Sequence, residues 1–359
     1  MEYKRLGDYI RELNVRNRDL KVAKPMGINI DKRFMPSVAN VVGTDLSVYK
    51  MVFKNQFACN LMHVGRDEKI PMAMHTNDNP IIVSPAYCVF EITKTEELLP
   101  EYLMMWFRRP EFDRNAWFYT DADVRGGLDK DAFMDMRLPV PSIDRQREIV
   151  AEYETLFNRI RLNEQMIEKL EATAQALYRK MFVDGVDMEH LPEGWRRGKL
   201  GDIAEVNSGK TCVDKSDIKD ELYKYPVAGA SGIIGFSSTY NYDEKLMTTG
   251  RVGTLGVVNR YNQQMFMADN VLVVRSKYYE YCYQILTGLD YSEITKGGVQ
   301  SLITQTDLKE SAVVIPPKDL LDSFEQQSMS IFSLVETKKQ ENSILTELQS
   351  LLLARMGKE

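Results

Sequence analysis

The stretch IVAEYETLFNRIRLNEQMIEKLEATAQALYRKM, from Ile149 to Met181, decides the architecture of this chain. Its apolar positions recur in alternating steps of four and three residues, which is the heptad pattern of a coiled-coil helix. A helix over this stretch spans about 50 Å at a rise of 1.5 Å per residue. The predicted seam consists of Ile149, Tyr153, Leu156, Ile160, Asn163, Ile167, Leu170, Ala174, Leu177 and Met181.

The C-terminal segment repeats this pattern. KLEATAQALYRKM at 169–181 returns as ILTELQSLLLARM at 344–356, a shift of 175. Polar residues near the middle of each seam, Asn163 and Lys338, would cost stability but could fix pairing and direction. We expect the two helices to pair, and the alternative that each packs as an amphipathic helix on a separate core stays open. The second seam is predicted to include Ile331, Val335, Leu345, Leu352 and Met356.

Other motifs also return in the same order, with a shift that drifts along the chain. The pairs are RLGDYI (5–10) with KLGDIA (199–204), Arg66 with Arg251, Gly126–Gly127 with Gly297–Gly298, and RLPVP with VVIPP. Two similar domains with different loop insertions would give such a drift. We therefore predict an internal repeat with four segments: a first domain at 1–141, a heptad helix and linker at 142–194, a second domain at 195–317, and a second heptad helix at 318–359.

Each predicted domain mixes strands and helices. PIIVSPAYCVFEI (80–92) and NVLVVR (270–275) are β-branched and aromatic runs bounded by turn residues, which is typical of strands. LPEYLMMWFRRPEF (99–112) has helical periodicity and ends near a proline. The predicted fold class is α+β, with two strand-rich domains and two long helices.

Composition is that of an ordinary globular protein of 359 residues, with 44% hydrophobic and 27% charged residues. The net charge of −6 is uneven: 1–140 and 195–315 are neutral, whereas 141–194 and 316–359 carry −4 and −2. A neutral domain can still present one basic face. The sequence has no apolar run long enough for a bilayer, no signal-peptide pattern and no CxxC pair, so we expect a cytoplasmic protein with reduced thiols and no membrane partner.

Motifs for catalysis and for metal binding are absent from the sequence. SGKT at 208–211 resembles part of a phosphate-binding loop, but that loop needs a glycine where Ala204 stands. Asn79-Pro80-Ile81 lacks the second proline and the aromatic residue of an amino-methyltransferase motif. The three histidines are too scattered for most metal sites. We predict no catalytic residue, no metal site and no cofactor in this chain.

Basic residues beside glycines form the remaining candidate site. Glycine lets a backbone approach a ligand closely, and arginine can contact guanine or phosphate. Neighbouring amides and hydroxyls can contact base edges or phosphate. The alternative for any one of them is a solvated turn residue. The predicted DNA-binding residues are Asn60, Arg66, Arg125, Lys210, Ser231, Arg251, Asn259, Lys296, Gln300 and Ser301.

The whole order of motifs resembles the DNA-specificity subunit of type I restriction-modification systems. VSPAYCVFEI, LPEYLMMWFRRPEFDR and RQREIVAEYETLFNRI are similar to its first recognition domain and central helix, and LPEGW, KLGDI, SGKT and GRVGTLG to its linker and second domain. The resemblance implies two target-recognition domains held apart by two antiparallel helices, with pseudo-twofold symmetry. Two half-sites about one DNA turn, or 34 Å, apart would need such a stiff spacer.

The resemblance also implies a division of labour. This chain would recognise a bipartite double-stranded DNA target without catalysing a reaction. Two methyltransferase subunits with S-adenosylmethionine, and two restriction subunits with ATP and magnesium, would supply the chemistry. Two other hypotheses stay open. One is a stand-alone coiled-coil DNA-binding or scaffold protein that dimerises by itself, and the other is a nucleotide-dependent enzyme that uses Ser208 to Thr211.

Overall fold

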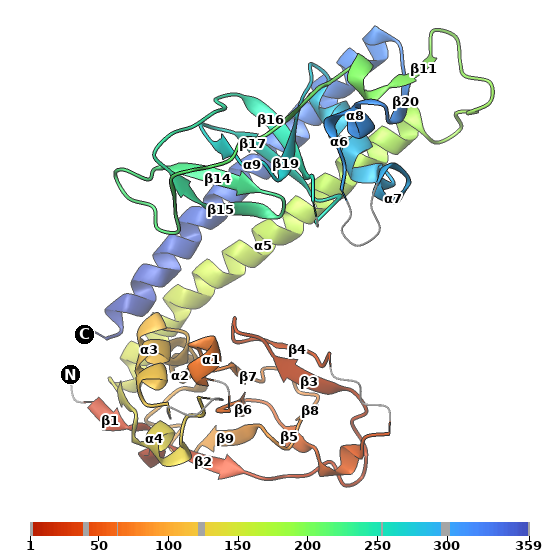
Figure 1. The fold of residues 1–359 in the computed structure, drawn as a ribbon. Helices are drawn as coiled ribbons and strands as arrows, with labels where there is room; N and C mark the ends of the chain where they lie inside the picture. Colours follow the sequence, from red (N-terminus) through yellow and green to blue (C-terminus); the bar gives the residue numbers. More distant parts are fainter. Residues whose placement is uncertain are drawn as a thin grey trace. The chain divides into compact units, whose positions relative to one another are not determined.

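The computed structural model describes residues 3–38, 43–62, 64–120, 126–252, 254–295 and 302–357, and Figure 1 labels their helices and strands. The chain divides into two compact units. The first unit is Met1–Asn163 with Gln340–Glu359, and the second unit is Glu164–Lys339. Both boundaries cut through the long helices α5 (Ile143–Phe182) and α9 (Lys318–Arg355), so each unit contains part of both helices. The sequence predicts boundaries after residues 141, 194 and 317 instead.

The described residues of the first unit form three small sheets. Strand β1 (Tyr3–Arg5) pairs with β10 (Arg137–Pro139) just before α5 begins. The second sheet has the order β2 (Ile10–Leu13), β9 (Cys88–Ile92), β6 (Phe57–Cys59) and β7 (Met72–Met74). The third has the order β4 (Phe34–Pro36), β3 (Pro25–Ile28), β8 (Ile81–Val83) and β5 (Lys50–Val52).

In the second unit, too, the part of the chain that the structure describes forms three sheets. Strand β11 (Arg196–Lys199) pairs with β20 (Ala312–Ile315) just before α9 begins. The second sheet has the order β12 (Glu205–Ser208), β19 (Val271–Arg275), β16 (Lys245–Gly250) and β17 (Val258–Asn262). The third has the order β13 (Lys215–Ser216), β15 (Gly232–Ser237), β14 (Tyr225–Gly229) and β18 (Phe266–Met267).

The strands follow closely matched plans in the two units. The two-stranded sheets β1–β10 and β11–β20 are both antiparallel. The second sheet of each unit is also antiparallel, and the strand that comes last in the sequence, β9 or β19, lies second in the order of the sheet. Each third sheet contains a hairpin whose first strand pairs in parallel with a later strand, β3 with β8 and β14 with β18. The repeated LGD motifs form 3₁₀ helices, η1 (Leu6–Asp8) and η3 (Leu200–Asp202), whose leucines are buried. The sequence repeat thus reports a shared order of pairing.

Short helices cover the sheets, and most begin at identifiable residues. In the first unit Pro100 and Pro110 stand at the starts of α2 (Pro100–Phe107) and α3 (Pro110–Phe118), where a missing N–H costs nothing. Side-chain oxygens of Asp129 and Thr304 cap α4 (Lys130–Asp135) and α8 (Gln305–Lys309). The remaining short helices are η2 (Leu46–Val48), α1 (Val64–Asp67), α6 (Tyr279–Gly288) and α7 (Tyr291–Ile294).

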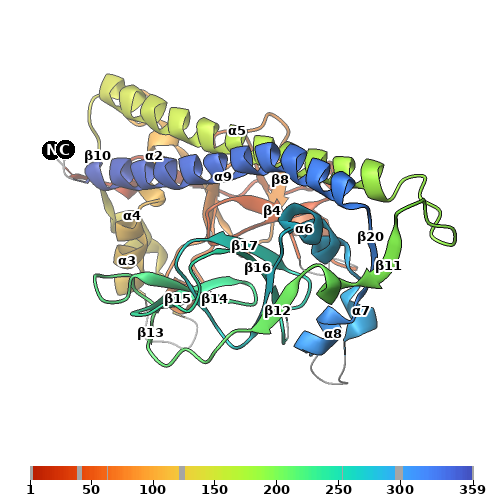
Figure 2. The ribbon, with the colours of Figure 1, turned by 90° about the horizontal axis from the view of Figure 1, so that it is seen from above.

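Helices α5 and α9 lie side by side in Figures 1 and 2. Arg159 bonds Glu341 and Asn163 bonds Asn342 in the first unit, whereas Glu171 pairs with Lys339 in the second. Further along α5 in the second unit, Ala174 packs with Val335 and Phe332, so partner numbers fall on α9 as they rise on α5 from Glu171, and the helices run antiparallel. Each predicted seam side chain is buried or half-buried. Toward their ends the helices also join the domain cores, through residues that include Ile149, Tyr153, Met356, Phe182 and Phe324.

The two chain ends meet in the first unit. The Tyr3 hydroxyl donates to the carbonyl of Gly357 at 3.0 Å. Leu353 and Met356, in the last turns of the chain, pack in the same core as Leu6 of the first turn. The first domain is therefore closed by contacts between residues at opposite ends of the sequence.

Candidate nucleic-acid interface

Five of the ten predicted DNA-binding residues have side chains that the structure describes: Asn60, Lys210, Ser231, Arg251 and Asn259. Arg125, Lys296, Gln300 and Ser301 lie outside the described residues. Arg66 lies on α1, but its side chain is not described. For all ten residues the assignment to DNA binding stays a prediction.

Arg251 follows β16 directly and is held by its backbone on two sides. Its N–H donates to the carbonyl of Asn270 at 2.9 Å, and its carbonyl accepts from the N–H of Ile303 at 3.0 Å. The side chain is half-buried, and its Nε has no hydrogen-bond partner among the described residues. A fixed backbone with an unsatisfied donor is what a ligand-contacting arginine requires, because the ligand can supply the missing acceptor.

Lys210 lies beside the turn at Ala268–Asn270, whose Asn270 carbonyl accepts the N–H of Arg251. Its N–H donates to the carbonyl of Met267 at 2.9 Å, and its side chain is exposed. A Cβ on the preceding Gly209 would collide with the carbonyl of Ala268, so this close approach requires glycine. Lys210 and Arg251 therefore approach the turn at Ala268–Asn270 from two different strands.

The SGKT segment does not form a phosphate-binding loop in this structure. It runs out of β12, and the next regular element along the chain is the short strand β13 and not a helix. The Thr211 hydroxyl donates to Asp269 at 2.9 Å. A phosphate-binding loop needs a helix N-terminus behind it. The nucleotide-dependent hypothesis therefore loses its structural basis.

Asn259 and Ser231 complete the group in the second unit. Asn259 on β17 lies opposite Thr248 on β16, and Asn259 Nδ2 and Thr248 Oγ1 are both buried without a partner among the described residues. Ser231 is exposed in the turn between β14 and β15. At Gly250 the end of β16 comes close to the turn between β14 and β15, because a Cβ on Gly250 would lie 3.1 Å from the Cβ of Ala230. Contacts of neighbouring residues thus gather Lys210, Ser231 and Arg251 at one edge, whereas Asn259 lies further along the sheet with its amide nitrogen buried.

Tyr291 supports this edge from α7. Its ring lies 3.3 Å from where a Cβ on Gly256 would stand, and its hydroxyl donates to the carbonyl of Leu286 at 3.0 Å. Burial raises the pKa of the Tyr291 hydroxyl, so the hydroxyl remains a neutral donor. The loop that follows Arg251 is therefore backed by a buried aromatic ring.

The first unit shows a different local arrangement. Asn60 Oδ1 accepts from the N–H of Met62 at 3.0 Å, which is a local turn bond that occupies the amide oxygen. The N–H of Gly65 donates to the carbonyl of Gly126 at 2.7 Å, and a Cβ on either glycine would collide with the other. These two glycines therefore let two loops of the protein cross. Space for a ligand does not explain them.

The pairing of Arg66 with Arg251 in the sequence repeat is wrong in structural terms. Phe57 pairs with Phe90 in the first unit as Met247 pairs with Val274 in the second. Arg251 stands four residues after Met247, and Leu61 stands four residues after Phe57, so Arg251 corresponds to Leu61. The backbone bonds agree, since Leu61 accepts from Leu128 as Arg251 accepts from Ile303. The loop from β6 to β7 is longer and contains α1, which shifted the sequence match.

Sequence reasoning missed two features of these edges. In the second unit it missed Thr248 and Asn270, whose buried side-chain oxygens lack partners among the described residues. In the first unit it missed the exposed aromatic run Trp117, Phe118 and Tyr119 at the end of α3. Three consecutive aromatic residues after a polar helix turn are a visible signal, whereas a threonine that faces another strand is not.

Over the residues that the structure describes, the side chains of His, Cys, Asp and Glu form no group of three that could hold a metal ion. None of the described helices is long and apolar enough to span a membrane. The arrangement in hand is a set of hydrogen-bonding groups on a fixed scaffold, which is suited to recognition of polar edges such as those of nucleic-acid bases.

Two similar α+β units, joined by a shared pair of long helices and carrying such edges, define a class of recognition protein. The family model of the type I restriction modification DNA specificity domain matches residues 192–349. That match covers less than half of the chain, which as a whole is similar to specificity subunits of type I restriction enzymes. Specificity subunits of these systems are non-catalytic, and the catalytic activities lie on partner subunits.

Two curated relatives and one solved structure illustrate the similarity. The MjaIX specificity subunit of Methanocaldococcus jannaschii is 22% identical over 65% of this chain and 64% of its own length, so the match spans less than two thirds of that relative. The HindI specificity subunit of Haemophilus influenzae is 20% identical over 77% of this chain and 80% of its own. The crystal structure of the S subunit from M. genitalium matches with a TM-score of 0.59 and 15% identity, over 99% of this chain and 95% of that one. At that identity the last match supports the fold alone.

Proposed function

We propose that this chain recognises a bipartite double-stranded DNA target, with one half-site for each unit, and directs the methyltransferase and restriction subunits of a type I complex to it. One observation carries the proposal. The closely matched strand plan occurs twice, and each copy leads through its terminal strand pair into one of the two long helices. A protein with two similar recognition units suits a target with two parts.

In this proposal α5 and α9 form an antiparallel coiled coil that separates the two units, and a pseudo-twofold axis relates the halves. The antiparallel contacts and the heptad seams support the coiled coil, and the matched strand orders support the symmetry. A stiff spacer is needed because two half-sites on one face of a duplex lie at a fixed distance and rotation. The helix of 40 residues is about 60 Å long at 1.5 Å per residue, which exceeds one DNA turn.

The partners in this proposal are double-stranded DNA, two methyltransferase subunits and two restriction subunits, and the complex works in the cytoplasm. S-adenosylmethionine, ATP and magnesium would be bound by those partners. The methyltransferase subunits would dock on the acidic helices. These assignments rest on the similarity of the chain to specificity subunits of type I restriction enzymes.

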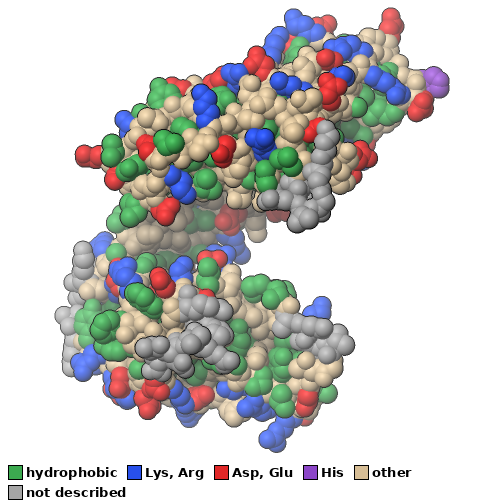
Figure 3. Space-filling model, in the orientation of Figure 1, with side chains coloured by type: hydrophobic (Ala, Val, Ile, Leu, Met, Phe, Trp, Pro, Cys, Tyr) green, Lys and Arg blue, Asp and Glu red, His purple; other side chains and the backbone are tan. Residues whose placement is uncertain are grey.

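Charge is consistent with recognition inside a larger complex. Figure 3 shows basic and acidic side chains interspersed over the visible face of both units. DNA affinity depends strongly on the number of phosphates neutralised by lysine and arginine. With a net charge of −6, this chain would rely on partner subunits for much of that neutralisation.

The test is a map of adenine methylation across a host genome, with and without this chain, in the presence of the methyltransferase subunit. We expect a two-part motif that disappears when the chain is deleted. An unchanged methylation map would contradict the proposal. Size-exclusion chromatography adds a second check, since a homodimer that ignores the methyltransferase subunit would favour the stand-alone scaffold hypothesis.

A further inference from the structure

A buried arginine in the second unit connects the central sheet to helix α9. Arg260 lies on β17, and its guanidinium Nη2 is 2.7 Å from both carboxylate oxygens of Glu280 on α6. The side chains of Arg260 and Glu280 are only 11% and 2% exposed. Lys245 adds a second cation at 3.0 Å from the same carboxylate. The pair therefore joins a strand to a helix in a largely water-free place.

The same guanidinium is enclosed by aromatic rings. Its central carbon lies 5.0 Å from the ring centroid of Tyr279, 4.7 Å from that of Tyr283 and 3.9 Å from that of Phe332. Phe332 belongs to α9 and is 3% exposed. Tyr283 and Phe332 meet edge to face at 5.6 Å. Cation–π contacts are strongest where water is excluded, so this contact holds β17 on α9.

The strand that carries Arg260 also carries a candidate DNA contact. Asn259 precedes Arg260, and neighbouring strand residues point to opposite faces of a sheet. Asn259 lies opposite Thr248, and Arg260 lies opposite Met247, which packs in the same core as Phe324 of α9. The face of β17 that carries Asn259 also carries Tyr261, which packs on a core with Leu246, and the other face is fastened to the long helix.

We propose that Arg260, clamped by Glu280 and Phe332, is a positioning residue that fixes the orientation of the second recognition unit on helix α9 and so sets the spacing of half-sites that the protein accepts. This inference rests on the proposed bipartite function. Geometry favours this role over a purely stabilising one. A planar guanidinium whose Nη2 bonds both carboxylate oxygens, and whose central carbon lies 3.9 Å from a ring centroid, restricts the orientation of the strand more than an apolar contact of similar size would.

Spacing is sensitive to such a clamp because of the shape of DNA. One base pair changes the rotation between two half-sites by roughly 35°, given 10 to 10.5 base pairs for each turn. A unit that could rotate on the helix would accept spacers one base pair longer or shorter. Loss of the clamp should therefore broaden the accepted spacing without altering the bases that are read.

The experiment uses the full chain in complex with its methyltransferase subunits. After the native motif is mapped, methylation rates are measured on duplexes with the native spacer and with spacers one base pair longer and shorter. The variants are Arg260→Lys, which keeps the charge but loses the planar fork, and Phe332→Leu, which keeps apolar volume but loses the ring. Phe332→Tyr keeps the ring and should behave as wild type. Met329→Leu is the matched control, since Met329 lies on the same helix and is 61% exposed.

We expect Arg260→Lys and Phe332→Leu to lower the preference for the native spacer about fivefold or more, with both half-site sequences unchanged. Met329→Leu and Phe332→Tyr should leave the preference intact. An unchanged preference in folded Phe332→Leu would overturn the inference, even if Arg260→Lys fails to fold. A wild-type complex that methylates no two-part motif would instead overturn the proposed function.

Discussion

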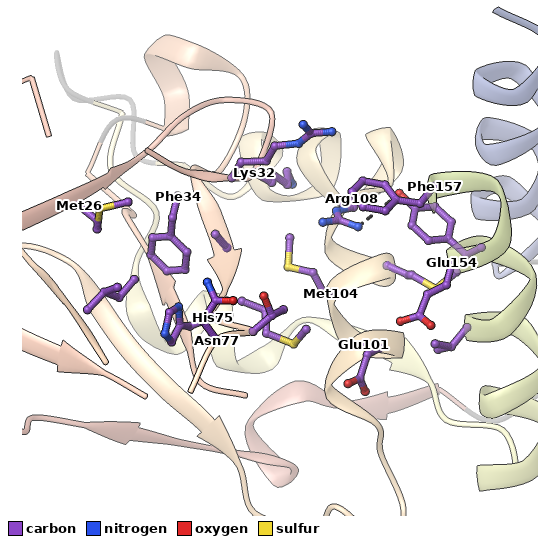
Figure 4. Close-up of a pocket in the computed structure, with 18 residues that line it drawn as sticks. Met26, Lys32, Phe34, His75, Asn77, Glu101, Met104, Arg108, Glu154 and Phe157 are labelled. Atoms are coloured by element: carbon purple, nitrogen blue, oxygen red, sulfur yellow. Dashed lines mark hydrogen bonds between the residues drawn. The ribbon is translucent and has the colours of Figure 1, made fainter. Parts of the chain in front are cut away.

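The two units share one strand plan, but they are fixed to the long helices in different ways. Phe157 on α5 and Phe332 on α9 are related by the 175-residue shift of the two helices. Phe332 is covered by Arg260 at 3.9 Å, whereas Phe157 is approached by Arg33 at 5.7 Å and Arg108 at 6.0 Å. Beside Phe157 the first unit retains a cavity of about 420 Å³, shown in Figure 4. The second unit fills the corresponding region with a buried ion pair and aromatic rings.

This difference shows how one topology can be fastened with different chemistry. The cavity in the first unit lies between the β3–β4 hairpin, α2 and α5, and its lining mixes apolar side chains such as Phe34 and Met104 with polar ones such as His75 and Glu154 (Figure 4). The buried ion pair of that unit, Lys32 with Asp113 at 2.7 Å, ties the hairpin to α3 instead of to the long helix. We infer that the second unit is held on its helix more firmly than the first.

The contacts between α5 and α9 also differ between the two units. In the first unit it has a polar contact, since Asn163 is 2% exposed and donates to Asn342 at 2.8 Å. In the second unit it has an apolar contact, where Ala174 packs with Phe332 and Val335. Apolar contacts favour association, and a buried polar pair favours one register.

The largest expected effect comes from breaking the ion pair of the second unit. Glu280→Gln leaves Arg260 buried without a full counter-charge and should lower the free energy of unfolding by about 3 to 5 kcal/mol. Asp113→Asn should have a similar effect on the first unit. Hydrogen exchange measured by mass spectrometry would report each unit separately. The control is Glu244→Gln, whose exposed partner contact with Arg275 should contribute less than about 1 kcal/mol. Equal losses in the free energy of unfolding for Glu280→Gln and Glu244→Gln would show that the Arg260–Glu280 pair contributes no more than an exposed ion pair.

The next effect concerns DNA recognition at the edge of the second unit. Arg251→Ala should weaken binding to one half-site by about 1 to 3 kcal/mol if the arginine contacts a base. Lys210→Ala should weaken binding to all sequences alike and make the salt dependence shallower by about one unit, as expected of a phosphate contact. Titrations of duplexes at several salt concentrations distinguish the two. Leu61→Ala, at the corresponding position of the first unit, should leave base preference unchanged.

A smaller effect is expected at the polar contact of the helix pair. Asn163→Leu alone removes a donor from Asn342 and should lower the free energy of unfolding by about 1 kcal/mol. The double variant Asn163→Leu, Asn342→Leu should restore stability or exceed that of the wild type, because both polar groups are then absent. Thermal unfolding of the two single variants and the double variant gives the coupling between the residues. Additive losses would show that the two amides act independently.

The smallest expected effect is a pH dependence of stability that is present in the second unit and absent from the corresponding contact of the first. Glu325 on α9 accepts the N–H groups of Glu280 and Tyr281 at 3.1 and 2.9 Å, and burial raises the pKa of its carboxyl. In the first unit Gln146 on α5 accepts the N–H of Leu99 with a neutral amide. Above the ordinary glutamate pKa the unfolded chain loses a proton that the folded chain keeps, so stability falls as pH rises through this window.

Glu325→Gln should flatten that slope, and Gln146→Glu should introduce one into the first unit. The change for Glu325→Gln should amount to less than about 1 kcal/mol, because Glu325 is partly open to water. Gln146→Glu should cost more at every pH, because Gln146 is buried and its amide nitrogen donates to the carbonyls of Glu97 and Pro141. Urea unfolding from about pH 4 to pH 7 measures it. A Glu325→Gln variant with the wild-type pH profile would mean that another group carries the dependence.

Much of the fold was predictable, because it depends on local patterns. The heptad spacing predicted both long helices, and the repeated motifs proved to be the strands and 3₁₀ turns that close each unit. The candidate site was less predictable. Its residues come from separate strands, and an inserted helix between β6 and β7 displaced the match of Arg66 to Arg251.

The sequence by itself determined the two helices and the order in which similar elements recur, since helical periodicity and turn residues act over a few neighbours. Tertiary structure alone decided that Arg260 meets Phe332 and that Arg251 meets Asn270. Such contacts join residues far apart in the chain, and they form only when packing and strand register bring distant segments together.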